Sequence, residues 1–202
     1  MLRWPQSVYY GSNASVGGIN IITRKGGIGD TYSATLELGN GTTATAFLSR
    51  RTARGGLSFA LSHSDDHGYD QSGDGGEKDG LKRTTAILSG DYLVTEDLKL
   101  GFTLRRAGED YDYDSTSFTA TDAPGYVVDD PTQFGTRDER TLGVYGEYAM
   151  LEGRLTHRLA YEDTRYESTF NGGAPTLTRT EALKYRLSFG LDGRSVAEAT
   201  IC

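Results

Sequence analysis

The chain has 202 residues, a formal net charge of −7, an apolar fraction of 36% and one cysteine, Cys202. The acidic balance argues against a nucleic-acid partner, because contacts with phosphates need clustered lysine and arginine. A lone cysteine excludes an intrachain disulfide. No apolar run approaches the about 20 residues of a transmembrane helix. The first residues show no signal-peptide pattern, and we therefore expect an internal piece of a longer chain or a broken gene product.

The first 27 residues contain a turn at Arg3-Trp4-Pro5, a second turn at Tyr10-Gly11 and a compact apolar strand from Ile19 to Ile22. This string resembles the end of the plug domain of TonB-dependent outer-membrane receptors, where an RGPxSxxYG…A…GG…INIIT pattern closes the plug before the barrel begins. Trp4 stands where the family usually has glycine, and the Gly17-Gly18 pair lies one position late. The residues that match are Arg3, Pro5, Gln6, Ser7, Tyr10, Gly11, Ala14, Asn20, Ile21, Ile22 and Thr23.

From residue 31 onward, apolar and polar residues alternate along successive segments. In residues 98–105, for example, three leucines and a phenylalanine alternate with Lys, Gly, Thr and Arg. Successive side chains of a strand point to opposite faces, so each segment has one apolar and one polar face. The alternation predicts eight strands, at about residues 31–39, 42–51, 56–65, 83–95, 98–108, 139–151, 153–167 and 178–192.

The connections between these predicted strands alternate in length. Those at 52–55, 95–97 and 151–153 are tight, and those at 66–82, 109–138 and 168–177 are long and polar; the short turn at 39–41 falls in the long series. An antiparallel meander places alternate connections at opposite ends of the sheet. Short turns at one end and long loops at the other are typical of outer-membrane barrels. The sequence therefore predicts an all-β fold, an antiparallel meander that forms part of a transmembrane β-barrel.

The resemblance implies two domains, the C-terminal end of a plug domain at residues 1–27 and the N-terminal portion of a β-barrel at residues 28–202. It implies a fragment of a receptor in the cell outer membrane, embedded in outer-membrane lipid. The intact protein would take up a metal chelate or vitamin, of the siderophore or cobalamin class, powered by the TonB energy-coupling complex. Family barrels have more strands than this chain supplies, so we do not expect the chain to transport anything alone.

The predicted loops 66–82 and 109–138 contain the acidic residues that are candidate metal ligands. Hard cations such as calcium bind several carboxylate and carbonyl oxygens from flexible loops. The segments HGYD (67–70) and DYD (112–114) resemble the loops with which the cobalamin receptor of this family gathers calcium. The alternative is that these acidic loops only keep the surface solvated. No cofactor is required by this interpretation, and the candidate calcium ligands are Asp70, Glu77, Asp79, Asp112 and Asp114.

No arrangement of residues for covalent catalysis is present: the chain has no G-x-S-x-G, no P-loop, no nucleotide-binding glycine motif after a strand and no C-x-x-C. The protein is therefore not predicted to be an enzyme. Two alternatives to the receptor remain at this point. One is a small eight-stranded outer-membrane barrel with an adhesive or structural role. The other is a soluble β-barrel enzyme or carrier.

Overall fold

The computed structural model describes residues 25–73, 75–121, 125–191 and 195–201, with the backbone alone for residues 191–201. All regular elements within these ranges are β-strands. No helix that is long and apolar enough to cross a membrane occurs in the part of the chain that is described. The predicted plug segment lies outside the described residues, except for residues 25–27.

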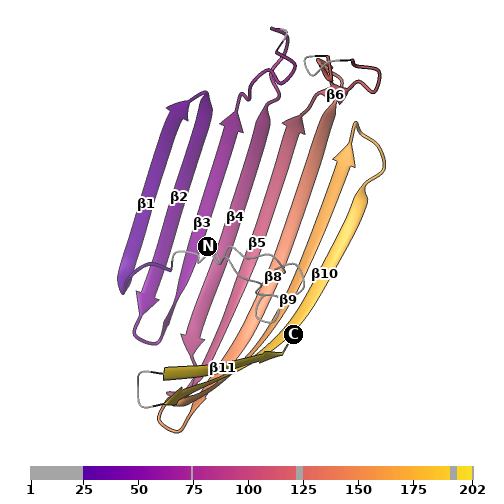
Figure 1. Ribbon diagram of the computed structural model, residues 1–202. Helices are drawn as coiled ribbons and strands as arrows, with labels where there is room; N and C mark the ends of the chain where they lie inside the picture. Colours follow the sequence, from indigo (N-terminus) through magenta and orange to yellow (C-terminus); the bar gives the residue numbers. More distant parts are fainter. Residues whose placement is uncertain (1–24, 74, 122–124, 192–194, 202) are drawn as a thin grey trace.

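Eight long strands follow one another in a single antiparallel meander (Figure 1). Each long strand pairs with the long strands that precede and follow it along the chain. The predicted all-β meander is confirmed, and each of the eight predicted strands overlaps one observed strand. The strands are β1 (Gly29–Gly39), β2 (Gly41–Thr52), β3 (Gly55–Asp66), β4 (Leu81–Leu93), β5 (Leu98–Asp112), β8 (Phe134–Met150), β9 (Leu155–Phe170) and β10 (Thr176–Leu191).

The strands extend further toward the long loops than the apolar alternation predicts. β5 continues to Asp112 and β8 begins at Phe134, whereas the predicted strands end at 108 and begin at 139. In this extension Glu109 lies opposite Arg83 on one side and Arg137 on the other. Cross-strand pairs of opposite charge stabilise a sheet. The backbone ladder therefore continues where the apolar pattern has ended.

Three short strands were not predicted. β6 (Ser115–Thr116) and β7 (Val127–Val128) form a small two-stranded sheet in the loop between β5 and β8. β11 (Ser195–Ile201) pairs with β10 and brings the main sheet to nine strands. The stretch from 195 to 201 alternates too weakly in large apolar residues to be recognised as a strand from sequence.

The pairing register gathers the large apolar side chains on one face of the sheet, here called the apolar face. One cross-strand row of this face runs through Leu48, Phe59, Leu88, Leu104 and Leu142 on five consecutive strands. The side chains of this face are open to the surroundings: Leu36 is 64% exposed, Leu100 47% and Leu183 61%. The opposite face, which carries Asp91 and Glu109, is called the polar face.

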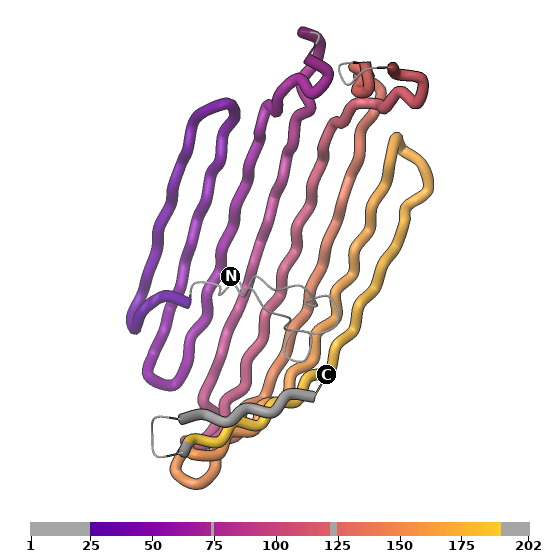
Figure 2. The backbone as a smooth tube through the Cα atoms, viewed as in Figure 1, coloured from indigo at the N-terminus to yellow at the C-terminus, as the bar shows by residue number. Residues whose placement is uncertain are grey.

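The described part of the chain has almost no hydrophobic core of its own. Phe47 and Ala107 are its only buried hydrophobic residues, and no large side chain is fully buried. A water-soluble domain buries the apolar face of a sheet against a second layer of structure. Figure 2 shows the described long strands side by side in one curved sheet. The described residues therefore leave the apolar face uncovered.

The polar face is instead held together by charges. The carboxylate of Asp91 is 5% exposed and lies 2.6 Å from Arg51, 3.5 Å from Lys99 and 3.8 Å from Lys25. Gly56 lies between Arg51 and Asp91 in the cross-strand row. Because Gly56 has no side chain, the guanidinium of Arg51 reaches Asp91 across β3. A Cβ at Gly56 would lie 2.8 Å from the carbonyl oxygen of Arg50.

A second ion cluster and two aromatic contacts continue the polar face toward β8. Glu109, whose side chain is 7% exposed, accepts hydrogen bonds from Arg83 and, at 2.7 Å, from Arg137. The rings of Tyr111 and Tyr145 cover their cross-strand partners Gly135 and Gly101, where a Cβ would overlap the ring. Aromatic side chains that cover a cross-strand glycine help to pin the register of a curved sheet.

The two ends of the sheet differ as predicted for two of the three long connections, and the edges of the sheet stay open. The third connection, predicted at 168–177, is only the short turn 171–175, because β9 extends to Phe170 and β10 begins at Thr176. The tight turn between β8 and β9 has positive φ at Leu151 (54°), Glu152 (59°) and Gly153 (83°). The long loops, 67–80 and 113–133, lie together at the opposite end (Figure 1). β1 and β11 are the two edges of the main sheet and do not pair with each other. The sheet is therefore not closed.

Candidate functional site

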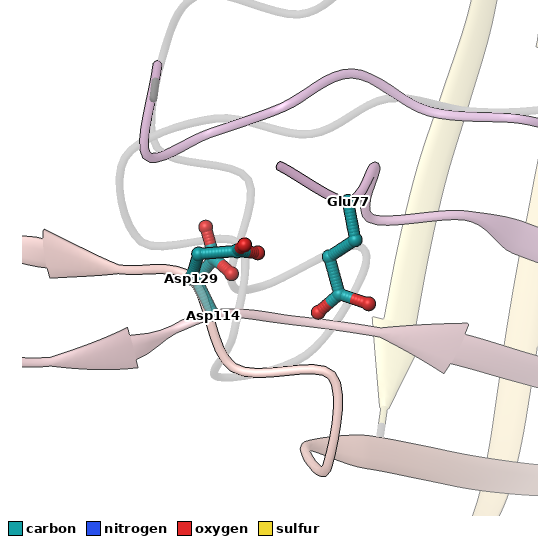
Figure 3. A group of neighbouring side chains, drawn as sticks. All are labelled: Glu77, Asp114 and Asp129. Carbon is teal, nitrogen blue, oxygen red and sulfur yellow. The ribbon is translucent and has the colours of Figure 1, made fainter. Parts of the chain in front are cut away.

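The two acidic loops meet beyond the ends of β3, β4 and β5 and form a group of three carboxylates (Figure 3). Glu77 comes from the loop between β3 and β4, Asp114 follows β5, and Asp129 follows β7. One carboxylate oxygen of each residue lies within 4.8 Å of one in the other two. These side chains are half-buried. The sheet thus brings Asp114 and Asp129, which lie 37 and 52 positions after Glu77 in the chain, next to Glu77.

The loop between β3 and β4 is held by its own backbone. The Gly68 N–H donates to Asp66 Oδ1 at 2.9 Å, and the Asp79 N–H donates to the Tyr69 carbonyl at 3.2 Å. Gly68 has φ +64°, and a Cβ there would overlap the Asp79 carbonyl. The Asp112 N–H donates to the Gly80 carbonyl at 3.0 Å, which joins this loop to the end of β5.

The second loop is organised around Asp130. Its carboxylate accepts hydrogen bonds from the hydroxyls of Ser115 and Thr132, each at 2.6 Å, and from the Gln133 amide at 3.0 Å. These hydrogen bonds to the charged form, that from Ser115 first, hold the pKa of Asp130 far below its usual range. The Asp130 N–H also donates to Asp114 Oδ1 at 3.4 Å. Asp130 therefore fixes the chain that carries Asp114 and Asp129.

The carboxylates where the two acidic loops meet lie beside other carboxylates, whereas those of the polar face are paired with cations. Burial, and then the charges of Asp114, Asp112, Asp129 and Asp70, raise the pKa of Asp79 above its ordinary value. Partial burial and the neighbouring carboxylates, that of Asp129 first, also raise the pKa of Glu77. Both oxygens of Asp79 and the Oδ1 atom of Asp129 are shielded from solvent without a hydrogen-bond partner among the described residues.

Such an arrangement favours a hard divalent cation. Calcium binds six to eight oxygen ligands at roughly 2.3–2.6 Å, with carboxylates supplied by flexible loops. The three grouped carboxylates offer up to six oxygens, and the neighbouring Asp79 and Asp112 add others. A cation at this point would remove the like-charge repulsion that raises the pKa values of Asp79 and Glu77. The chemistry of the donors therefore fits calcium, and calcium binding remains a prediction.

The five candidate ligands named from sequence do not occupy equivalent places. Glu77 and Asp114 belong to the three-carboxylate group, and Asp79 and Asp112 lie close enough to act on its charge. Asp70 instead organises its own turn, where it accepts hydrogen bonds from the Ser72 hydroxyl at 2.7 Å and from the Gly73 and Gly75 N–H groups at 2.6 and 2.8 Å. These hydrogen bonds, that from Ser72 first, lower its pKa.

Sequence reasoning missed Asp129. The residue lies in the second loop, in the pair Asp129-Asp130, but fifteen positions separate it from Asp114. Only the β6–β7 pairing, which sets Ser115 opposite Val128, brings Asp129 back beside Asp114. This Asp-Asp pair, the only one in residues 113–133, was the available signal in the sequence.

Comparison with protein-family models, with curated proteins and with solved structures found no match to this chain. What is established is therefore the fold: an all-β chain whose main sheet is an open antiparallel meander with one apolar and one polar face.

Proposed function

We propose that this chain is a wall segment of a TonB-dependent outer-membrane receptor, joined to the end of its plug domain. The intact protein takes up a metal chelate or vitamin across the outer membrane, with energy supplied by the TonB complex. The observation that carries this proposal is the exposed apolar face, which has no cover within the described residues, set against a polar face rich in ion pairs. A barrel wall in lipid has this distribution, with lipid on the apolar side and a polar lumen on the other.

The height of the apolar face supports the membrane assignment. On β8 the apolar side chains of this face extend from Leu142 to Met150, and charged side chains replace them at Arg140 and Asp138. A tilted transmembrane strand needs about 9 to 11 residues to cross the bilayer. The apolar stretch of β8 has this length, and the remainder of the strand extends beyond it.

The open edges support a barrel wider than the described strands can form. β1 and β11 each have one side without a partner strand in the main sheet. Unpaired backbone N–H and C=O groups are too costly in hydrocarbon for an open sheet to span a bilayer. In this proposal further strands complete the wall, and the open edges support the large receptor barrel over an eight-stranded one.

The entry of the chain into β1 supports a plug on the polar face. Lys25 forms an ion pair with Asp91 at 3.8 Å, and a Cβ at Gly26 would overlap the Ser49 hydroxyl. Asp91 and Ser49 are both buried residues of the polar face. The residues that follow the plug-like motif thus lie against the side of the wall that would form the lumen.

In this proposal the acidic loops belong to the outer surface. The long loops of outer-membrane barrels are extracellular and the short turns periplasmic. A calcium ion held by Glu77, Asp114 and Asp129 would join the two loops and so order the surface that first meets the chelate or vitamin. The chain's role is binding and transport, with no covalent step.

Labelling of single cysteines tests the membrane assignment. In a Cys202→Ser background, Leu100→Cys places a thiol on the apolar face and Thr103→Cys places one on the polar face of the same strand. We expect a water-soluble maleimide to label the Thr103→Cys protein in isolated outer membranes, and to label the Leu100→Cys protein only after denaturation. Equal labelling of both positions would contradict a lipid-facing wall.

Uptake in cells tests the transport assignment. We expect accumulation of radiolabelled cobalamin or of a ferric chelate to require the gene, and to stop when a protonophore dissipates the proton-motive force. Restoring the gene should restore uptake of one ligand class and leave the others unchanged. Identical accumulation of every labelled compound with and without the gene would remove the transport proposal and leave the wall structure standing.

A further inference from the structure

Four arginines form one cross-strand row on the apolar face. Arg106 on β5 lies opposite Arg140 on β8, Arg140 opposite Arg165 on β9, and Arg165 opposite Arg179 on β10. Their side chains are between 50% and 68% exposed. Like charges placed directly opposite each other destabilise a sheet. Such a row therefore needs a separate explanation.

Acidic neighbours within the chain offset only part of this charge. Asp138 lies between Arg106 at 3.1 Å and Arg140 at 2.7 Å. Asp163 likewise lies between Arg165 at 3.6 Å and Arg179 at 2.5 Å. Each of these carboxylates is shared by two guanidinium groups, and an arginine has five N–H donors. Glu181 forms an ion pair with Arg179 at 3.1 Å. Among the described residues, Arg106 and Arg140 form ion pairs only with Asp138, and Arg165 only with Asp163.

The row is local and does not continue around the wall. On the preceding strands the same cross-strand row contains Ala34, Ala46, Leu61 and Ala86. A general belt of charge at the edge of the apolar face would continue across all of these strands. The arginines are confined to the half of the sheet formed by β5, β8, β9 and β10.

A groove connects the arginines to the apolar side chains. It has a volume of about 480 Å³ and is lined on one side by Leu88, Leu104 and Leu142 and on the other by Arg106, Arg140 and Arg165, with Asp163 the only carboxylate in its wall. Adjacent strands are about 4.8 Å apart, so the three arginines span roughly 10 Å. This width suits one phosphorylated headgroup, whose acyl chain would lie on the leucines.

We infer that this groove binds a phosphorylated lipid of the surrounding leaflet, with the phosphate held by Arg106, Arg140 and Arg165 and the acyl chain against Leu88, Leu104 and Leu142. The positive charge of the groove wall complements the phosphate, and planar guanidinium groups bind phosphate oxygens in a bidentate manner. The inference rests on the proposed function in one respect, which is that the apolar face meets lipid.

Native mass spectrometry of the protein, extracted from its membrane in mild detergent, tests the inference. The probes are bisphosphorylated lipid A, the same lipid after enzymatic removal of both phosphates, and inorganic phosphate. The test variant is the triple change Arg106→Gln, Arg140→Gln and Arg165→Gln. The matched control is Arg50→Gln, which removes an 83% exposed arginine from the same face at the opposite end of a strand.

We expect the unaltered protein and the Arg50→Gln protein to retain one lipid A, and the triple variant to lose affinity by about tenfold or more, since charge-assisted contacts to the phosphate disappear. The dephosphorylated lipid should bind each protein equally weakly. Equal lipid A affinity in the triple variant and the control would overturn the inference. Displacement of the lipid by millimolar inorganic phosphate would also overturn it, in favour of a site for free anions.

Two further measurements keep the test decisive. If the triple variant fails to fold, as judged by its resistance to unfolding in detergent, the three single variants replace it, and each should bind lipid A more weakly than the control. Labelling of Leu100→Cys distinguishes failure of the lipid site from failure of the membrane wall. If the thiol is protected in intact membranes but lipid binding does not depend on the arginines, only the lipid site is refuted. If the thiol is labelled in intact membranes, the membrane wall itself is refuted.

Discussion

The two faces of this sheet are formed by the same strands but differ in which side chains are exposed and which are buried. On the apolar face, side chains such as Leu100 are exposed and have no partner that could cover them within the described residues. On the polar face, Asp91 and Glu109 are buried and each is surrounded by cations. A soluble protein would cover the first face and leave the second in water. This inverted distribution is the one expected of the proposed barrel wall, whose two faces would meet lipid and water.

A second contrast separates the carboxylates of the polar face from those of the loops. Asp91 and Glu109 have guanidinium groups within hydrogen-bond distance. Glu77, Asp79 and Asp129 lie instead beside other carboxylates, and burial together with these neighbours raises the pKa of Asp79. The first group is neutralised by cations of the chain itself, whereas for the second group we propose that a cation from solution supplies the balancing charge.

A charge placed on each face in turn gives the largest expected difference. We expect Leu100→Arg to lower the free energy of unfolding in lipid vesicles by about 3 kcal/mol, because an arginine on the lipid face near the bilayer midplane costs roughly 2–4 kcal/mol. Thr103→Arg, on the polar face of the same strand and opposite Gly143, should cost less than about 1 kcal/mol. Urea titration of both proteins in vesicles makes the comparison, and equal losses would show that the two faces do not meet different media.

Removal of one charge from the polar face should have the next largest effect. Asp91→Asn leaves Arg51 and Lys99 without their buried partner, and we expect a loss of about 2 kcal/mol in the same assay. The matched change is Glu147→Gln, whose pair with Arg158 at 3.0 Å is about one-third exposed on both sides. That change should cost no more than about 1 kcal/mol. A larger loss for Glu147→Gln would mean that burial does not determine the strength of these pairs.

The acidic loops give a prediction about calcium and pH. Asp114→Asn should weaken calcium binding about tenfold, since the charge of the ligands determines affinity at such sites, whereas Asp97→Asn at the turn end of the sheet should leave it unchanged. Isothermal titration calorimetry on both proteins provides the measurement.

The pH dependence of that binding follows from the direction of the pKa shifts. Raised pKa values mean that Asp79 and Glu77 hold protons more tightly in the folded protein than in the unfolded chain. The loops without calcium therefore lose stability as the pH rises from the ordinary carboxylate range through the raised values. Calcium competes with those protons, so its affinity should fall as the pH drops through the same window. If calcium affinity stayed constant until the pH reached the ordinary pKa range of aspartate, the neighbouring carboxylates would not be raising the pKa values of Asp79 and Glu77.

The smallest expected effect concerns an aromatic contact on the polar face. A methyl group at Gly101 would overlap the Tyr145 ring, which lies under Arg158 with 3.7 Å between the guanidinium carbon and the ring centroid. We expect Gly101→Ala to cost about 1 kcal/mol as the ring moves aside. Gly143→Ala on the neighbouring strand has its nearest atom at 3.9 Å and should change stability by less than about 0.5 kcal/mol. Similar values for the two variants would show that Tyr145 does not rest on Gly101.

Strand identity was predictable from sequence, and strand length was not. The alternation of leucine and phenylalanine with polar residues in 98–105 locates β5 correctly, because successive side chains of a strand point to opposite faces of the sheet. The same pattern stops near Leu104, while β5 continues to Asp112 through charged pairs such as Glu109 with Arg137. Charged residues at a strand end look the same in sequence as charged residues in a loop.

The candidate site was predictable only as two acidic loops. Glu77 and Asp114 could be named because acidic residues cluster in each loop, but the contact with Asp129 depends on the β6–β7 pairing. In the sequence Asp70 looked equivalent to Glu77 and Asp114. Only the structure shows that its carboxylate accepts hydrogen bonds from Ser72, Gly73 and Gly75 within its own turn.

The sequence by itself determined that the chain forms an antiparallel meander with two unlike faces, short turns at one end and long loops at the other. These properties are local, because alternation and turn residues act within a single strand or connection. The tertiary structure alone decided which distant residues meet: Arg51 with Asp91 across Gly56, Glu77 with Asp114 and Asp129, and the four arginines of one row. Such meetings depend on the pairing register, since a shift of one residue would move each of these side chains to the other face.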